Sequence, residues 1–220
     1  MCTNYRPSSR DLIREQFGAA VDFEFPDETY PAYVAPILRA SDDGTTACIA
    51  ACFGLIPRWS RDAKLARSTY SARSETVATK PSFRAPWRER RYCLVPMQSF
   101  FEPRYDGERS TRWRIERADG SDFCVAGIWE SWRSPTGPVA VSFSMLTINA
   151  DRHALMSQFH APGDEKRSLV VIDPAQYRSW LQATPPQAAA LLRPFDATAF
   201  RAAADPRPAR RRKPAATGDA

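Results

Sequence analysis

Residues 92–148 limit the possible folds more than any other part of the sequence, because they form a series of β-patterned segments separated by turn signals. The predicted strands are 92–96, 99–102, 111–116, 123–129 and 139–148. Asp119-Gly120 is a preferred two-residue hairpin turn and predicts that the strands on its two sides pair with each other. A second hairpin is predicted through Pro135-Thr136-Gly137-Pro138, so we expect much antiparallel β-structure.

Short helices and further strands are predicted on both sides of this stretch. Residues 8–18 form an amphipathic pattern, with Ser8 or Ser9 as the N-cap and Gly18 as the end. Other helical segments are predicted over 60–67, 73–80, 81–91, 150–158, 175–181 and 185–192, and strands over 33–36, 45–53 and 168–172.

The length and the charge distribution favour one folded domain followed by a basic tail. With 220 residues, 43% of them hydrophobic, residues 1–200 can bury a single core. Residues 201–220 carry six basic and two acidic side chains, which is +4 of the total net charge of +6 and leaves +2 for the domain. We expect this tail to be disordered, serving either as a solubilising end or as a nonspecific attraction for phosphate.

Several classes of protein are excluded by what the sequence lacks. It has no run of eighteen apolar residues and no basic-then-apolar leader, so we expect a cytoplasmic protein with no membrane span. The cysteines are odd in number and show no metal-ligand spacing: Cys2, Cys48, Cys52, Cys93 and Cys124. We therefore expect reduced thiols, no metal and no cofactor.

The start of the chain, Met1-Cys2, offers an unusual pair of nucleophiles. If Met1 is removed, Cys2 carries a free α-amine next to its thiol, and these groups ordinarily titrate near pH ~7.7–8.0 and ~8.5. Both are then partly nucleophilic at neutral pH, and an aldehyde can form an imine with the amine that the thiol closes to a thiazolidine ring. The alternative is that Cys2 is a chance residue at an unstructured chain start.

Two other residues, His160 and Glu102, could take part in acid–base chemistry. His160 lies in a polar loop, 159–167, of the kind that often carries catalytic groups, whereas His153 falls in a predicted helix and suits a surface or packing role. Glu102 follows two phenylalanines and precedes Pro103. It is either a solvated strand end or a carboxylate shielded from water, and shielding would favour proton transfer.

Six short blocks occur in an order that resembles the SRAP family (SOS-response-associated peptidases). They are Met1-Cys2, residues 33–36, residues 54–59, residues 71–76, residues 91–96 followed by Phe100-Phe101-Glu102, and His160. The resemblance implies a single compact α+β domain of curved antiparallel β-sheets flanked by short helices. It also implies an autopeptidase that removes its own Met1 and then forms a covalent, lyase-like Schiff-base crosslink to abasic sites in single-stranded DNA, acting as a monomer that joins the nucleoid when engaged.

The resemblance also implies roles for four catalytic positions. Cys2 supplies the amine and thiol, Glu102 moves protons during imine formation and reversal, and His160 assists opening of the sugar ring. Ser71 stands where the family usually has an asparagine that orients the thiazolidine, and its shorter hydroxyl has a different hydrogen-bonding capacity.

Contacts to DNA are implied for four further residues. Arg73 is expected to contact the DNA backbone, while Trp59 and Pro36 line the cleft where bases unstack. Asn4 lies in the Cys2-Thr3-Asn4 start, where the family has Cys-Gly-Arg, so one arginine contact is lost and Asn4 is expected to face the DNA in its place.

Two other functions remain open from the sequence. One is an N-terminal-cysteine peptidase whose thiol attacks an amide carbonyl while the α-amine acts as base. The other is a non-catalytic binder of single-stranded nucleic acid, which would use the arginines between Arg84 and Arg91 together with the tail.

Overall fold

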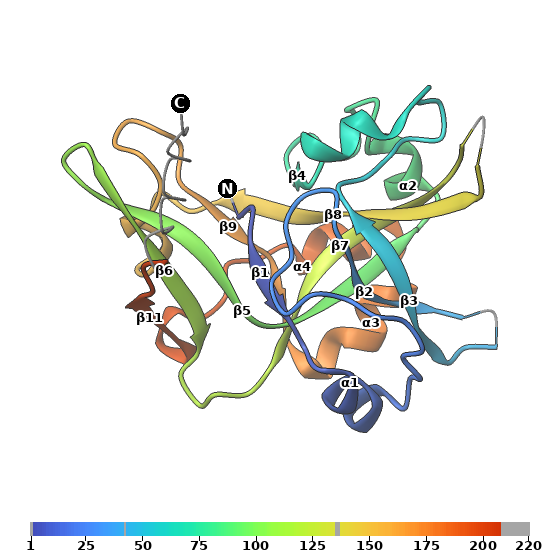
Figure 1. Cartoon of the computed structure of the whole chain (residues 1–220), viewed down its shortest axis with the longest axis horizontal. Coiled ribbons are helices and arrows are strands. Elements are labelled where there is room, and N and C mark those ends of the chain that lie inside the picture. The colour runs from blue at the N-terminus through green and yellow to red at the C-terminus, as the bar shows by residue number, and fades with distance from the viewer. Residues whose placement is uncertain (1, 42, 135–136, 208–220) are drawn as a thin grey trace, which may run out of the picture.

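The chain folds into one large β-sheet with short helices around it, as the computed structural model in Figure 1 shows. The structure describes residues 2–41, 43–134 and 137–207. The strands are β1 Tyr5–Pro7, β2 Val34–Ala40, β3 Thr46–Phe53, β4 Ser71–Arg73, β5 Tyr92–Asp106, β6 Arg109–Arg117, β7 Phe123–Arg133, β8 Val139–Asn149, β9 Arg167–Leu169, β10 Val171–Ile172 and β11 Phe200–Ala204. The α-helices are α1 Arg10–Phe17, α2 Arg84–Arg88, α3 Tyr177–Gln182 and α4 Pro185–Leu191, and the 3₁₀ helices are η1 Ala63–Arg67, η2 Met156–Gln158, η3 Pro174–Gln176 and η4 Ala197–Ala199.

Strand β5 organises the sheet because it pairs along its length with several other strands. Its first part, residues 92–97, pairs with β7, and its second part, residues 99–106, pairs with β6. The strand order is β10-β7-β8-β3-β2-β5-β6-β11, and the additional pairing of β5 with β7 closes β7, β8, β3, β2 and β5 into a ring. Strand β1 adds to β5 where the strand leaves this ring.

Two hydrophobic clusters lie on the two faces of the ring. Along β5, Cys93 and Val95 belong to one cluster and Tyr92 and Leu94 to the other, as the two-residue period of a strand requires. The outer cluster contains side chains from the helices: Ile13, Trp87, Tyr177, Trp180 and Ala188. The helices therefore cover the outer face, and Figure 1 shows α1 and α3 together below the sheet in this view. The other, interior cluster includes Cys2.

The predicted fold class is confirmed: the chain is an α+β domain of curved, mainly antiparallel β-structure with short helices. The strands join into one continuous sheet in which β8 pairs in parallel with β3 and β4. Helix α1 is also as predicted, because the Ser9 side chain accepts from the Leu12 N–H and Gly18 ends the helix with φ 64°.

Several local predictions were wrong, among them the helix over 150–158, of which only the 3₁₀ helix η2 forms. The strands on either side of Asp119-Gly120 do not pair with each other, because β6 and β7 each pair with β5, at different points along it. The segments 92–96 and 99–102 are parts of a single strand. The helix predicted from Arg73 is absent: Arg73 ends β4, and residues 74–79 form turns.

The predicted boundary at residue 200 falls inside an ordered element. Strand β11 pairs with β6 from Phe200↔Arg117 to Ala204↔Trp113, so residues 201–204 belong to the sheet. The tail beyond residue 207 lies outside the described residues, as do Met1 and the turn residues Pro135 and Thr136. Within the described part of the chain, no helix is both long and apolar enough to cross a membrane.

Candidate functional site

The first strand holds the start of the chain against β5. Tyr5 pairs with Phe100, and the Asn4 carbonyl accepts a 3.0 Å hydrogen bond from the Phe101 N–H. The Asn4 amide donates to the carbonyl of Thr29 at 3.2 Å. Residues preceding Tyr5 are therefore fixed by backbone and side-chain bonds beside the part of β5 that carries Glu102.

The Cys2 side chain is buried at this place, with a relative exposure of 2%. Its thiol donates to the Asn4 carbonyl at 3.2 Å. Burial, and after it the negative charge of Glu102, raises the pKa of the Cys2 thiol to about 12. The expectation of a partly ionised thiol at neutral pH was therefore wrong, because that value applies to a cysteine in water; here the thiol needs a proton acceptor before it can react.

Glu102 and His160 form a buried pair next to Cys2. Glu102 is 3% exposed and His160 is 7% exposed, and His160 Nε2 lies 3.2 Å from Glu102 Oε2. Glu102 points to the same face of β5 as Phe100, two residues earlier, which belongs to the interior cluster with Cys2. Of the two interpretations of Glu102, the shielded carboxylate is the one observed.

The loop that carries His160 is tied to β5 and to its own end. The His160 N–H donates to the carbonyl of Pro103 at 2.9 Å, and Lys166 Nζ donates to the carbonyls of His160 and Ala161 at 3.3 and 2.8 Å. His160 has φ 69°, a conformation rarely adopted by residues other than glycine. The loop therefore holds the imidazole against Glu102 in a conformation that the surrounding contacts must maintain.

A pocket of about 540 Å³ opens beside Glu102 and the chain start. It is lined by Thr3, Asn4, Phe101, Glu102, Pro103, Ser110, Thr111, Arg112, Pro206 and Arg207. The lining brings together the N-terminal residues, β5, β6 and the segment after β11, so a ligand in the pocket would meet side chains from both ends of the described chain.

Tyr70 packs against the interior cluster that includes Cys2, and its neighbour Ser71 begins β4. Ser71 is half-buried at the start of β4, in register with Met145 of β8. Burial and, after it, the charges of Cys2 and Glu102 raise the pKa of Tyr70, which keeps its hydroxyl protonated near the reacting groups. Tyr70 was not predicted as a site residue, because its only signal in the sequence was an aromatic side chain directly before the Ser71 block.

Arg73, the predicted backbone contact, is paired with a carboxylate. Its side chain is 52% exposed, and Nη1 lies 2.9 Å from Glu165 Oε2. Glu165 also bonds the buried Arg167 at 2.8 Å, and Arg167 in turn binds Glu75. A phosphate that binds Arg73 would have to compete with Glu165.

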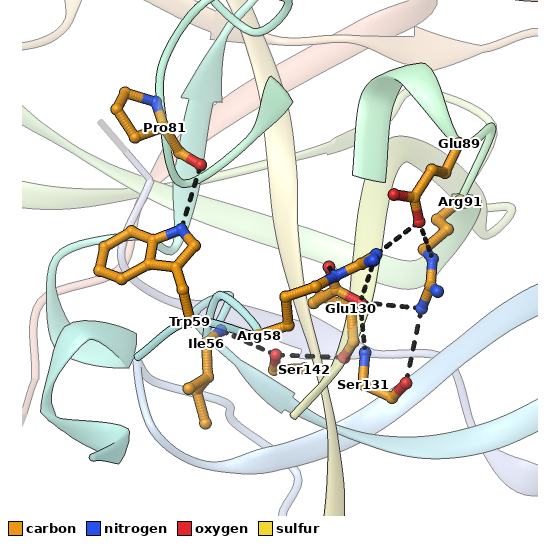
Figure 2. Close-up of polar contacts among 9 residues, drawn as sticks. All are labelled: Ile56, Arg58, Trp59, Pro81, Glu89, Arg91, Glu130, Ser131 and Ser142. Atoms are coloured by element: carbon orange, nitrogen blue, oxygen red, sulfur yellow. Dashed lines mark hydrogen bonds and ion pairs between the residues drawn. The ribbon is translucent and has the colours of Figure 1, made fainter. Parts of the chain in front are cut away.

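Trp59 is the most exposed of the predicted DNA-binding residues, at 59%, and an ionic network lies behind it. Figure 2 shows Arg58 between Glu89 and Glu130 while the Trp59 ring points away, toward Pro81. Glu130 is 1% exposed and binds Arg58 Nε at 3.0 Å and Arg91 Nη1 at 2.8 Å. The network holds the Arg58 side chain, while the exposed Trp59 donates its indole N–H to the Pro81 carbonyl at 3.4 Å.

The structure brings Cys2, Glu102 and His160 together and places Asn4 beside them. Pro36 lies within β2, opposite Ala50 of β3, and its side chain is buried. Among residues 2–41, 43–134 and 137–207, no group of three or more His, Cys, Asp or Glu side chains is arranged to hold a metal ion.

A buried Glu–His pair beside a cysteine at the chain start, on a sheet of this topology, defines a class of protein. The chain belongs to the SOS response associated peptidase (SRAP) family, whose family model matches residues 1–204. The resemblance found in the sequence is thereby confirmed.

Particular relatives can be named. The chain is 33% identical over 208 residues to the abasic site processing protein YoqW of Bacillus subtilis (strain 168), covering 90% of this chain and 88% of YoqW. It is 24% identical over 221 residues to the abasic site processing protein HMCES of Mus musculus, covering 80% of this chain and 61% of HMCES. A crystal structure of a protein from Bordetella bronchiseptica matches with a TM-score of 0.86 and 31% identity, covering 93% of this chain and 99% of that chain.

Proposed function

We propose that this chain processes abasic sites in single-stranded DNA, as a monomer, by forming a covalent thiazolidine link through Cys2 after removal of Met1. The observation that carries the proposal is the burial of Cys2 beside the Glu102–His160 pair, next to a pocket that opens at the same place. The names of the relatives, abasic site processing proteins, support the choice of DNA substrate.

The proposed reaction begins with the amine. The ring-opened abasic sugar presents an aldehyde, the Cys2 nitrogen adds to it, and loss of water gives an imine. Protonated Glu102 donates the proton with which the hydroxyl leaves as water; the nitrogen keeps its hydrogen as a protonated imine, and Glu102 is left as a carboxylate in contact with His160.

The second step uses the thiol. Because the pKa of Cys2 is about 12, the thiol is protonated when the imine forms. The Glu102 carboxylate accepts the thiol proton as the sulfur attacks the carbon of the protonated imine, whose electron pair moves to the nitrogen, and the five-membered ring closes with Glu102 protonated again. The net change is one water released per link formed.

A self-directed peptidase activity is a second candidate, supported by the description of the family as peptidases. In it the Cys2 thiol, deprotonated by Glu102, attacks the carbonyl of Met1 and takes the methionyl group as a thioester, which frees the Cys2 amine; water then hydrolyses the thioester and releases methionine. Turnover of other peptides without DNA would extend this activity beyond the chain itself.

Intact mass and adduct formation test the proposal together. Purified protein should lack the mass of Met1, and incubation with an oligonucleotide that carries an aldehyde-bearing abasic site should add the mass of the DNA minus one water. Cys2→Ala should abolish the adduct. An adduct that persists in Cys2→Ala, or purely reversible binding, would contradict the proposal, and the latter would favour the non-catalytic binder.

A further inference from the structure

The segment after β11 crosses from the edge of the sheet to the pocket beside Glu102. Pairing of β11 with β6 ends at Ala204↔Trp113, and the Asp205 N–H extends it by donating to the Arg112 carbonyl at 2.9 Å. Pro206 and Arg207 then line the same pocket as Thr3, Asn4 and Glu102. The C-terminal end of the described chain therefore meets its N-terminal end at the candidate site.

Arg207 is held at the pocket by an aromatic side chain. Its guanidinium carbon lies 5.2 Å from the centre of the Tyr30 ring, and Nη2 donates to the Tyr30 hydroxyl. Stacking on a neutral ring orients an arginine without neutralising its charge.

The other two arginines near the candidate site are differently placed. Arg112 lies 2.8 Å from a Glu28 carboxylate oxygen, and Arg73 lies 2.9 Å from Glu165. An incoming anion would have to displace a carboxylate from either of them. Arg207 is exposed and can bind an anion while it remains stacked on Tyr30.

We propose that Arg207 is a phosphate-binding residue for the DNA strand, and that the pocket it lines with Thr3, Ser110 and Thr111 receives the phosphodiester next to the abasic sugar. The inference rests on the proposed DNA substrate and adds a binding site to it. Hydroxyl groups and one available guanidinium suit a single phosphate anion. Glu102, whose charge acts on the Cys2 thiol, also lines this pocket.

Most residues of the site belong to the part of the chain that the family model matches, and Arg207 does not. The family model ends at residue 204, and Arg207 follows it. A C-terminal arginine thus lines the pocket beside Thr3 and Asn4, neither of which carries a positive charge.

The test measures binding without crosslinking. Single-stranded DNA containing a tetrahydrofuran residue, which has no aldehyde, is titrated with the full chain by fluorescence anisotropy at several salt concentrations. Arg207→Ala should weaken binding about two- to fivefold and reduce the slope of log K against log salt by about 0.7. Arg207→Lys should retain part of the binding, because it keeps the charge without the planar stacking group.

A matched control and a second assay keep the outcomes distinct. Arg178→Ala removes the same charge from α3, in a separate pocket near α1, and should change neither affinity nor slope. If Arg207→Ala matches this control, or binds more tightly because the segment merely blocks the pocket, the inference is overturned. Absence of a Cys2-dependent adduct on aldehyde-bearing DNA would instead refute the proposed function, while the anisotropy result would still decide the role of Arg207.

Discussion

Glu102 Oε2 and His160 Nε2 lie 3.2 Å apart, and a second contact fixes this geometry: the His160 N–H donates to Pro103, the residue after Glu102. The backbone of His160 thus keeps its imidazole within 3.2 Å of the carboxylate. Because both side chains are buried, a proton that moves from one to the other is shielded from water. The arrangement gives the carboxylate a partner that can supply or remove a proton in each step at Cys2.

Replacing Glu102 should separate the acidity of the Cys2 thiol from its reactivity toward an aldehyde. Glu102→Gln removes the charge that contributes, after burial, to the raised pKa of Cys2, so the thiol should ionise at lower pH than in the parent chain. Thiazolidine formation should nevertheless slow by about 10²-fold or more, because the proton acceptor is lost. The pH dependence of alkylation of the N-terminal peptide, read by mass spectrometry, measures the first effect. Glu116→Gln on β6 is the control, and an unchanged alkylation profile in Glu102→Gln would contradict the argument.

The buried thiol should also destabilise the fold at alkaline pH. The folded pKa of Cys2 is raised from 9.0 to about 12, so between these values the unfolded chain has released a proton that the folded chain retains. The free energy of unfolding therefore falls as pH rises through this window, by about 1.4 kcal/mol per pH unit for one group. Urea unfolding between pH 9 and pH 11 should show a shallower decline for Cys2→Ala than for the parent chain. Parallel curves would mean that the thiol is not desolvated.

Several elements that depend on local sequence signals were predicted correctly. The predictions failed where a strand pairs with a strand other than its neighbour in the sequence. The caps of α1 and the strand at Thr46–Phe53 were predictable because Ser9, Gly18 and Gly54 act on their own neighbours. The pairing of β6 and β7 was not, because the Asp119-Gly120 turn is compatible with a hairpin and only the length of β5 provides a partner for both strands. Cys2, Glu102 and His160 were found through the order of their blocks, whereas Tyr70 and Arg207 required the folded positions of β4 and the segment after β11.

A side chain at Gly54 should be poorly tolerated. Gly54 has φ +115°, and an added Cβ would lie 1.8 Å from the backbone oxygen of Ala66. Gly54→Ala should therefore lower the free energy of unfolding by more than about 3 kcal/mol. The backbone of Ala66 must move away from the new methyl group, and the alanine at position 54 must keep a strained backbone conformation. Gly44→Ala is the control: its φ is +81° but nothing lies within 4 Å, so only about 1–2 kcal/mol of strain is expected. Equal losses in the two variants would show that the contact with Ala66 can relax.

Glu165 should oppose DNA binding at Arg73. The pair is separated by 2.9 Å, and both side chains are about a third or more exposed, so the ion pair is weak but competes directly with a phosphate. Glu165→Gln should tighten binding to the non-reactive oligonucleotide about two- to fivefold at low salt, and Arg73→Ala should weaken it. In the double variant the gain from Glu165→Gln should vanish. A gain that survives without Arg73 would assign the effect to net charge alone.

The network behind Trp59 should control the stacking of DNA bases without touching DNA. Glu130 is buried and bonds Arg58 and Arg91, while the Ser142 hydroxyl donates to the Glu130 carbonyl and accepts from the Ile56 N–H (Figure 2). Glu130→Gln removes the negative charge between Arg58 and Arg91, and both arginines keep Glu89 as a partner. The segment that carries Arg58 and Trp59 should therefore become more mobile while the sheet remains folded.

The expected loss of stability in Glu130→Gln is about 1–3 kcal/mol, because the two arginines are only partly buried and can be hydrated. Glu24→Gln, at a carboxylate that is 90% exposed, should leave the free energy of unfolding unchanged within the error of the measurement. Binding of non-reactive single-stranded DNA should weaken in Glu130→Gln to about the level of Trp59→Ala, and combining the two changes should add little, because both act through the same ring. Full additivity in this cycle would mean that Glu130 supports the fold and has no part in presenting Trp59.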